Sequence, residues 1–290
     1  MHWRMQWVWS PPHSPDHAGG APWTCSGPGT VVALGGGVLT ERAMAERFRQ
    51  AVIVAAGFGS RLQPMRPGGS LIKPLEPVGG RPILLRVLDA AFDAGIEEAV
   101  IVVGHMADVV ESTVRKWSVA GPVRFVFNPR YELSNGVSLC CGARECTGHF
   151  VLLMSDHLFQ VGTLRRMVTR GMGTDLAVLA VDHKIDQVFD LDDATKVVAE
   201  GDRIVQIGKD LASYNCIDTG MFLLADTVTP RLEALIRDEG DASISRVMKQ
   251  LIAERRMGAF DIGDGFWQDV DTPEMLHEAE RAIAEGRFQG

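Results

Sequence analysis

Hydrophobic positions follow two different spacings along most of this chain. From residue 51 onward, short continuous apolar runs alternate with stretches in which apolar residues recur every three or four positions. The first pattern is typical of strands buried on both faces, and the second is typical of amphipathic helices. In the first half of the chain the expected strands cover residues 51–56, 99–103, 123–127 and 150–154. Such alternation predicts an α/β fold of the three-layer, Rossmann-like kind, with a mainly parallel sheet between helices.

The pattern changes after residue 154. The sequence predicts a strand over 175–181, then a hairpin whose strands, 195–200 and 203–207, are joined at Gly201-Asp202. A strand that ends at Leu224, an amphipathic helix over 244–255 and an edge strand over 258–262 follow. Residues 182–220 are therefore expected to form a small β-rich region attached to the larger sheet.

Residues 1–43 differ from the rest of the sequence. They contain Trp3, Trp7, Trp9 and Trp23, which are four of the six tryptophans, among Pro, Gly, Ser and His and without usable periodicity. A signal peptide is a poor fit, because the only apolar stretch begins late and is interrupted by glycines. We expect a disordered segment or an upstream extension of the reading frame, followed by one domain over residues 44–290.

Composition narrows the classes of partner. The net charge of -8 argues against a protein whose whole surface binds nucleic acid or an anionic membrane. No apolar run approaches the roughly 20 residues that a membrane span needs. The five cysteines form no CxxC pair and no zinc-ligand spacing, which suits a reducing, cytoplasmic location.

The turn after the first expected strand has features of a phosphate site. The strand ends at Ala55-Ala56, and Gly57, Gly59, Ser60 and Arg61 follow, with Lys73 beyond a Pro/Gly-rich passage. Glycines after a buried strand let backbone N–H groups approach a phosphate. Arg61 adds a rigid fork of donors and Lys73 a mobile positive charge. The spacing fits neither a Walker loop nor a dinucleotide fingerprint, and an ordinary βα turn would require neither cation.

Acidic residues point to a metal site. Asp156 follows the apolar strand over 150–154, where a carboxylate is costly unless it faces a ligand crevice or a cation. Mg²⁺ is commonly held by one or two carboxylates together with phosphate oxygens. The alternative role for Asp156 is to cap the helix expected near Val161. Asp269 and Asp271 lie two residues apart, so in an extended segment both face one side, and either could be a second ligand.

Other polar residues allow two interpretations each. Asn135 and Ser138 open a helix that they could cap, or their side chains could contact a base or ribose. Lys196 and Lys209 flank the expected hairpin and could be surface charge or substrate contacts. His105 follows the second strand and is either structural or near the ligand crevice.

Taken in order, these residues resemble the signature of the nucleotide-sugar pyrophosphorylase superfamily of NTP transferases. The matching segments are Gly57-Phe58-Gly59-Ser60-Arg61-Leu62-Gln63-Pro64, Lys73-Pro74-Leu75 and Gly80-Arg81-Pro82-Ile83-Leu84. The resemblance implies that residues 182–220 form a lid over the second substrate. It also implies a role for each candidate residue. Arg61 would bind the leaving phosphates and Lys73 the α-phosphate, and Asp156 with Asp269 or Asp271 would bind Mg²⁺. The residues implied at the nucleotide are Ala55, Ala56, Gly57, Gly59, Ser60, Asn135 and Ser138, and those implied at the acceptor are Lys196, Lys209 and Asp218.

Within that superfamily the chain is most similar to the CTP:inositol-1-phosphate cytidylyltransferases. The similarity rests on six short segments, which are Asn135 to Leu139, Met154 to His157, Ala194 to Val197, Ile207 to Leu211, Ile217 to Gly220 and Asp269 to Thr272. It implies transfer of a cytidylyl group from CTP to inositol-1-phosphate, with any onward transfer made by a separate membrane phosphotransferase. Two alternatives stay open: a nucleotidyltransferase for a sugar-1-phosphate or phosphocholine with CTP or another NTP, and a catalytically silent regulatory or binding homologue.

Overall fold

The computed structural model describes residues 48–59, 61–62 and 72–288. Ser60 and residues 1–43, for which predictions were made above, lie outside this part of the chain. The described helices are α2 (Ile83–Asp93), α3 (Ala107–Val114), α4 (Asn135–Ala143), α5 (Val161–Arg170), α6 (Val228–Glu239), α7 (Ile244–Ala253) and α8 (Pro273–Ala284), with short 3₁₀ turns η2 (Lys73–Leu75) and η3 (Ile185–Gln187).

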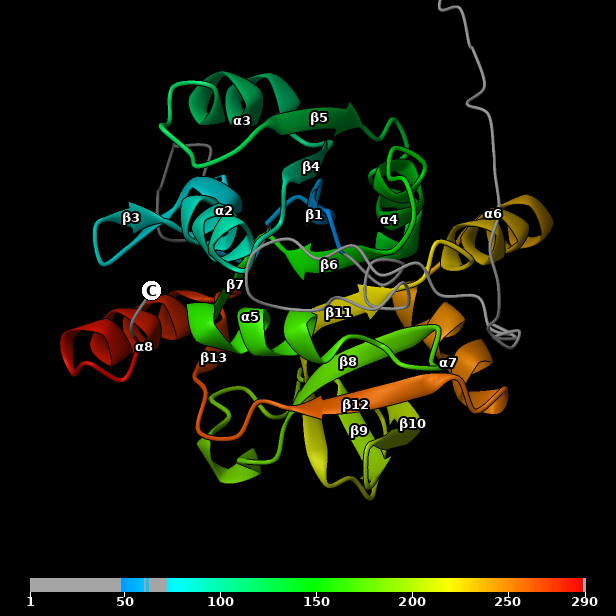
Figure 1. Ribbon diagram of the computed structural model, residues 1–290. Coiled ribbons are helices and arrows are strands. Elements are labelled where there is room, and N and C mark those ends of the chain that lie inside the picture. Colours follow the sequence, from blue (N-terminus) through cyan, green and yellow to red (C-terminus); the bar gives the residue numbers. More distant parts are fainter. Residues whose placement is uncertain (1–47, 60, 63–71, 289–290) are drawn as a thin grey trace, which may run out of the picture. The chain divides into compact units, whose positions relative to one another are not determined.

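A large mixed sheet forms the centre of the described domain (Figure 1). Its strands, in spatial order, are β5 (Val123–Phe127), β4 (Glu98–Val103), β1 (Gln50–Ala55), β6 (Phe150–Met154), β11 (Cys216–Leu224), β8 (Ala177–Asp182), β12 (Met257–Asp261), β10 (Arg203–Gly208) and β9 (Lys196–Glu200). Two small antiparallel pairs lie outside it: β2 (Pro77–Val78) with β3 (Arg81–Pro82), and β7 (His157–Phe159) with β13 (Trp267–Asp269).

The sheet has a parallel and a largely antiparallel half. Strands β5, β4, β1 and β6 are mutually parallel. Strand β11 runs antiparallel to both β6 and β8, and β10 is antiparallel to β12 and β9. The α/β prediction is confirmed. The sheet is mixed, because β11 runs antiparallel to its neighbours β6 and β8 and because the second half also contains the hairpin of β9 and β10. The strand expected at an edge, β12, instead lies between β8 and β10.

Alternating side chains of the central strands enter two cores, one on each face of the sheet. In β1, Ile53 belongs to a core that contains residues of α2, α5 and α8, whereas Val52 belongs to a core that contains residues of α4, α6 and α7. Figure 1 shows these helices on opposite sides of the sheet. Burial on both faces explains why the strands are continuously apolar in sequence. The predicted arrangement of three layers is therefore confirmed.

Several local signals in the sequence have the expected effect. Helix α2 follows Pro82 and ends before Gly95, whose φ is +92°. Thr272 caps α8, since its side chain accepts a hydrogen bond from the Met275 N–H at 3.3 Å. The hairpin of β9 and β10 turns at Gly201, whose φ is +60°. In the part of the chain that the structure describes, no helix is long and apolar enough to cross a membrane.

Candidate active site

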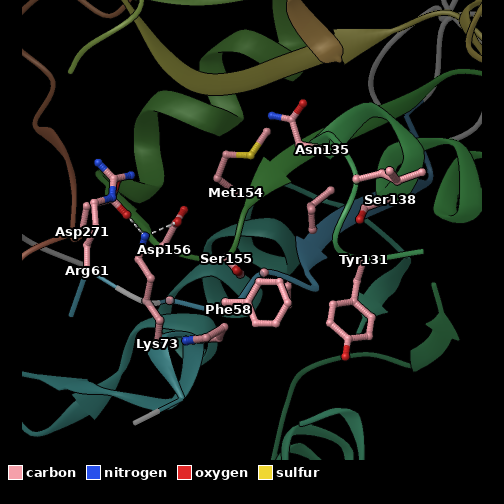
Figure 2. Close-up of a pocket in the computed structure, with 16 residues that line it drawn as sticks. Phe58, Arg61, Lys73, Tyr131, Asn135, Ser138, Met154, Ser155, Asp156 and Asp271 are labelled. Carbon is pink, nitrogen blue, oxygen red and sulfur yellow. Dashed lines mark hydrogen bonds and ion pairs between the residues drawn. The ribbon is translucent and has the colours of Figure 1, made fainter. Parts of the chain in front are cut away.

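A cavity of about 380 Å³ lies beyond the carboxyl ends of β1 and β6 (Figure 2). Ligands commonly bind at this end of a parallel sheet. The glycine turn forms one wall, and the ends of β6 and α4 form others. The described lining residues are Val54, Ala55, Gly57, Phe58, Gly59, Arg61, Lys73, Pro74, Tyr131, Leu133, Asn135, Ser138, Met154, Ser155, Asp156 and Asp271. Ala56, predicted at the nucleotide, is buried, and its carbonyl accepts from the His105 N–H at 3.1 Å instead of lining the cavity.

The two glycines of the turn have different constraints. Gly59 has a φ of +60°, and a Cβ there would lie 2.8 Å from Cβ of Lys73. A Cβ on Gly57 would meet no heavy atom within 4 Å. Gly59 therefore permits the close approach between the turn and η2, which carries Lys73, and Gly57 leaves open space at the cavity wall.

Two cations and two carboxylates meet in the wall of the cavity. The Lys73 residue is only 8% exposed, and its Nζ donates to Oδ2 of Asp156 at 2.5 Å and to Asp271. Arg61 also donates to Asp271. Figure 2 shows these side chains converging from the glycine turn, η2, the end of β6 and the segment before α8. Segments far apart in sequence thus form one charged cluster.

Neighbouring charges determine the ionisation of this cluster. Burial alone would raise the pKa of Asp156, but Lys73 and His157 hold that pKa below its ordinary range. Burial would lower the pKa of His157, whose Nδ1 lies 2.8 Å from Oδ1 of Asp156, yet the contact with this carboxylate raises it. Asp156 is therefore a carboxylate over a wide pH range, and His157 is cationic more often than a free histidine.

The three predicted metal ligands lie near one another but differ in their contacts. Asp156 and Asp271 both line the cavity and share the Lys73 ammonium, whereas Asp269 lies in β13 opposite His157 of β7. Burial raises the pKa of Asp269, and the neighbouring Asp156 raises it further against the opposing effect of His157. Over the described residues, no group of three or more His, Cys, Asp or Glu side chains could hold a metal. Asp156 and Asp271, which both face the Lys73 ammonium, are suited to bind Mg²⁺ if substrate phosphates complete the coordination of the metal.

A second cavity, of about 250 Å³, adjoins the first. The two share Arg61, Asn135, Met154, Asp156 and Asp271 as lining residues. The other described residues that line the second cavity are His157, Asp193, Ala194, Thr195, Lys209, Asp218, Gly220, Phe222, Ile244, Ser245, Trp267 and Asp269. The charged cluster therefore lies at the junction of the two cavities.

Of the three residues predicted at the acceptor, two line this second cavity. Lys209 and Asp218 do so, and burial raises the pKa of Asp218 to about 6. Lys196 is buried, and its Nζ donates to the backbone carbonyl of Asp192 at 3.0 Å. Its described contact therefore stabilises the preceding loop, and a direct acceptor contact for Lys196 stays a prediction.

Asn135 and Ser138 line the first cavity but do not cap their own helix. Oδ1 of Asn135 accepts from the Ile244 N–H at 3.1 Å, at the start of α7, and Oγ of Ser138 accepts from Nδ2 of Asn128 at 2.9 Å. These bonds connect α4 to neighbouring elements. A nucleotide contact by either residue stays a prediction.

Sequence reasoning missed three groups of contacts near the site, although it considered His105 as a residue near the ligand crevice. Phe58 is 43% exposed and forms an aromatic cluster with His105 and Tyr131, with ring centroids 5.1 and 5.3 Å from its own. Trp267 stacks on His157 at 6.0 Å. Asp193 contacts both Arg61 and Lys209. An aromatic residue between the two glycines was a signal for the first group, but only the fold brings the other partners together.

Comparisons with known proteins place this geometry in context. The family described as MobA-like NTP transferase domain matches residues 51–255. A "Bifunctional IPC transferase and DIPP synthase" of Archaeoglobus fulgidus is 31% identical over 84% of this chain and 46% of its own length. A protein with the same name from Rubrobacter xylanophilus is 35% identical over 80% of this chain and 51% of its own length. The chain thus spans about half the length of these curated relatives.

Solved structures resemble the same part of the chain. The inositol-1-phosphate CTP transferase from T. maritima superposes with a TM-score of 0.71 at 26% identity, over 84% of this chain and 98% of that one. A UDP-glucose pyrophosphorylase from Acinetobacter baumanii has a TM-score of 0.68 at 19% identity, over 82% and 94% of the two chains. At that identity the second likeness concerns the fold alone.

Proposed function

The chain belongs to the family of MobA-like NTP transferase domains, and from that premise we propose that it transfers a cytidylyl group from CTP to inositol-1-phosphate. The products would be CDP-inositol and pyrophosphate. The names of the inositol-1-phosphate CTP transferase and of the bifunctional IPC transferases support this choice of substrates.

One observation carries the proposal. The cavity beside the glycine turn and the cavity beside the β9–β10 hairpin share Arg61, Asp156 and Asp271 as lining residues, and Lys73 of the first cavity contacts both of these carboxylates. A nucleotide triphosphate in the first cavity and a phosphorylated acceptor in the second would bring their phosphates together at this junction. Such a placement turns an encounter of two substrates into a reaction between neighbouring groups.

The reaction that fits this arrangement is an in-line displacement. A phosphate oxygen of the acceptor attacks the α-phosphorus of the nucleotide, the bond from that phosphorus to the β-phosphate oxygen breaks, and pyrophosphate leaves. The acceptor phosphate is already anionic, so the attack requires no general base. The protein contributes by positioning the two anions and by neutralising charge.

Specific side chains would supply these contributions. The Lys73 ammonium contacts the two carboxylates that line both cavities and would stabilise charge on the α-phosphate. The more exposed Arg61 would bind the leaving β- and γ-phosphates. Asp156 and Asp271 would hold Mg²⁺, which when bound neutralises phosphate charge. Asp269, which lines only the second cavity of the two, would instead face the acceptor.

The lining of the second cavity suits a phosphorylated polyol. Lys209 offers a cation for the acceptor phosphate, and Asp218, Thr195 and Ser245 offer oxygen groups for ring hydroxyls. A cytoplasmic location stays a prediction, supported by the free thiols of Cys140, Cys141, Cys146 and Cys216.

A substrate panel tests the proposal. Pyrophosphate release is measured with Mg²⁺ for CTP, UTP, GTP and ATP, each combined with inositol-1-phosphate, glucose-1-phosphate or phosphocholine. We expect turnover with CTP and inositol-1-phosphate well above every other pair. Turnover with a different pair would reject the proposed substrates, and nucleotide binding without turnover for any pair would favour a regulatory role.

A further inference from the structure

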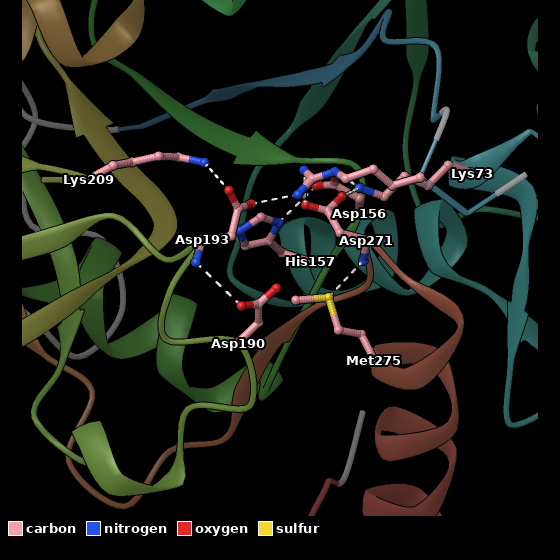
Figure 3. A network of polar contacts seen from close by, with 9 residues as sticks. Lys73, Asp156, His157, Asp190, Asp193, Lys209, Asp271 and Met275 are labelled. Carbon is pink, nitrogen blue, oxygen red and sulfur yellow. Dashed lines mark hydrogen bonds and ion pairs between the residues drawn. The ribbon is translucent and has the colours of Figure 1, made fainter.

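Asp193 lies in the loop between η3 and β9 and contacts two cations at once (Figure 3). Its Oδ2 accepts from Nη1 of Arg61 at 2.6 Å, and its Oδ1 accepts from Nζ of Lys209 at 2.5 Å. Arg61 belongs to the glycine turn, whereas Lys209 follows β10. One carboxylate therefore connects the nucleotide side of the site to the hairpin side.

The loop that carries Asp193 is fixed by several other bonds. The carboxylate of Asp190 accepts from the Asp193 N–H at 3.3 Å, and the Asp190 carbonyl accepts from the Ala194 N–H at 3.1 Å. The buried ammonium of Lys196 donates to the Asp192 carbonyl at 3.0 Å. These contacts set the backbone direction of the loop independently of Arg61 and Lys209. The Asp193 side chain is 34% exposed, so ligands can compete for it.

The cations that Asp193 contacts are the ones that substrate phosphates would need. In the proposed reaction Arg61 binds the nucleotide's terminal phosphates and Lys209 binds the acceptor phosphate. Burial would raise the pKa of Asp193, but Lys209 and Arg61 hold it below its ordinary value, so the side chain carries negative charge at neutral pH. An incoming phosphate therefore competes with this carboxylate for one cation or both.

We propose that Asp193 is a positioning residue that holds Arg61 and Lys209 in the substrate-free protein and is displaced from them by substrate phosphates. This inference rests on the proposed function. It has two consequences. Asp193 keeps two exposed, flexible cations in place before the substrates arrive, and it lowers the affinity for phosphate by competing for them. Loss of the carboxylate should strengthen anion binding, whereas loss of a purely structural residue should weaken it.

The matched substitutions are Asp193→Asn and Asp192→Asn. Both remove one negative charge from adjacent positions, but Asp192 is exposed, and only its backbone carbonyl has a described contact with Lys196. The comparison therefore separates the specific competition from a general change in the electrostatic field. Asp193→Ser is a second variant that also removes the carboxylate, and thermal unfolding verifies that each variant is folded.

The measurement is calorimetric titration of each protein with inorganic pyrophosphate, at low and at high ionic strength. At low salt we expect Asp193→Asn and Asp193→Ser to bind pyrophosphate about three- to tenfold more tightly than the unsubstituted protein. The factor is of this size because pyrophosphate no longer has to compete with two solvent-accessible ion pairs, each of which is weak. Asp192→Asn should stay within about twofold, and the difference should shrink at high salt because exposed charges are screened. Binding by folded Asp193 variants that is unchanged, or weaker than in Asp192→Asn, would overturn the inference.

Steady-state kinetics give a second readout. Asp193→Asn should lower KM for the nucleotide by a similar factor and leave kcat within about threefold. A large loss of kcat would contradict displacement, because it would mean that Asp193 acts during the chemical step. Pyrophosphate binding requires neither CTP nor inositol-1-phosphate. Tighter binding without turnover of that pair would thus reject the proposed substrates and retain the role of Asp193, and turnover without tighter binding would do the reverse.

Discussion

Replacing Lys73 by methionine tests the role of the charged cluster. The substitution keeps an unbranched side chain of similar length and removes the ammonium that Asp156 and Asp271 share. Without that cation the two carboxylates repel each other, and the pKa of Asp156 should rise because Lys73 is the main charge that lowers it. The variant should therefore lose both stability and catalytic rate, for separable reasons.

The two losses differ in size. Breaking a fully buried pair by removing one partner costs about 3–5 kcal/mol. Here the side chains of Asp156 and Asp271 are 27% and 15% exposed, so water can compensate and we expect a stability loss of about 1–3 kcal/mol. Loss of a preorganised charge at the reacting phosphate should lower kcat about 10²- to 10³-fold. KM for the nucleotide should change less than tenfold, since Arg61 and the glycine turn are retained.

The assay is steady-state pyrophosphate release, accompanied by urea unfolding of each protein. Arg124→Met is the matched control, because Arg124 also contacts two carboxylates, Glu98 at 3.1 Å and Glu145 at 2.6 Å, near the amino end of β4 and away from both cavities. The control should lose stability and keep kcat within about threefold. A value of kcat for Lys73→Met within tenfold of the unsubstituted protein would refute the assigned role.

Two further predictions concern stability. Gly59→Ala should lower the free energy of unfolding by about 2 kcal/mol in urea titration, because alanine is strained at φ +60° and its Cβ would clash with Lys73. As a control, Gly57→Ala should change the free energy of unfolding by no more than about 0.5 kcal/mol. Equal losses for the two variants would contradict the different constraints on these glycines. The pKa of Asp218 is raised to about 6 in the folded chain, so Asp218 keeps a proton there that it releases near pH 4 in the unfolded chain. The contribution of Asp218 to the free energy of unfolding should therefore fall as the pH rises from about 4 to 6. The free energy of unfolding of Asp218→Asn should therefore exceed that of the unsubstituted protein by about 1–3 kcal/mol at pH 7 and by little at pH 4. Asp210→Asn, which changes an exposed carboxylate, is the control. A gain in stability that is independent of pH would contradict the raised pKa of Asp218.

The sequence was sufficient to predict the α/β class and the family. Continuous apolar runs such as residues 150–154 require burial on both faces, which in turn requires two layers of helices. The order of Gly59, Arg61 and Lys73 carried the family resemblance, which the match over residues 51–255 confirms. These signals are local or appear in chain order, so a single sequence reveals them.

Relations between distant segments could not be predicted in the same way. Asp269 and Asp271 are equivalent in sequence spacing, and only the pairing of β13 with β7 turns Asp269 toward His157 while Asp271 reaches Lys73. The position of β12 inside the sheet depends on where the hairpin of β9 and β10 pairs. The contact of Asp193 with Arg61 spans 132 residues, and an acidic residue in a loop gives no sign of such a partner.

In the proposed reaction the acceptor phosphate attacks the α-phosphorus of the nucleotide. The most direct test supplies CTP together with inositol-1-phosphate whose phosphate oxygens are labelled with ¹⁸O, and locates the label by mass spectrometry and ³¹P NMR. We expect CDP-inositol with ¹⁸O in the bridge between its two phosphorus atoms and pyrophosphate without label. Label in the pyrophosphate, or a nucleotide product whose phosphorus–phosphorus bridge lacks ¹⁸O, would contradict this mechanism.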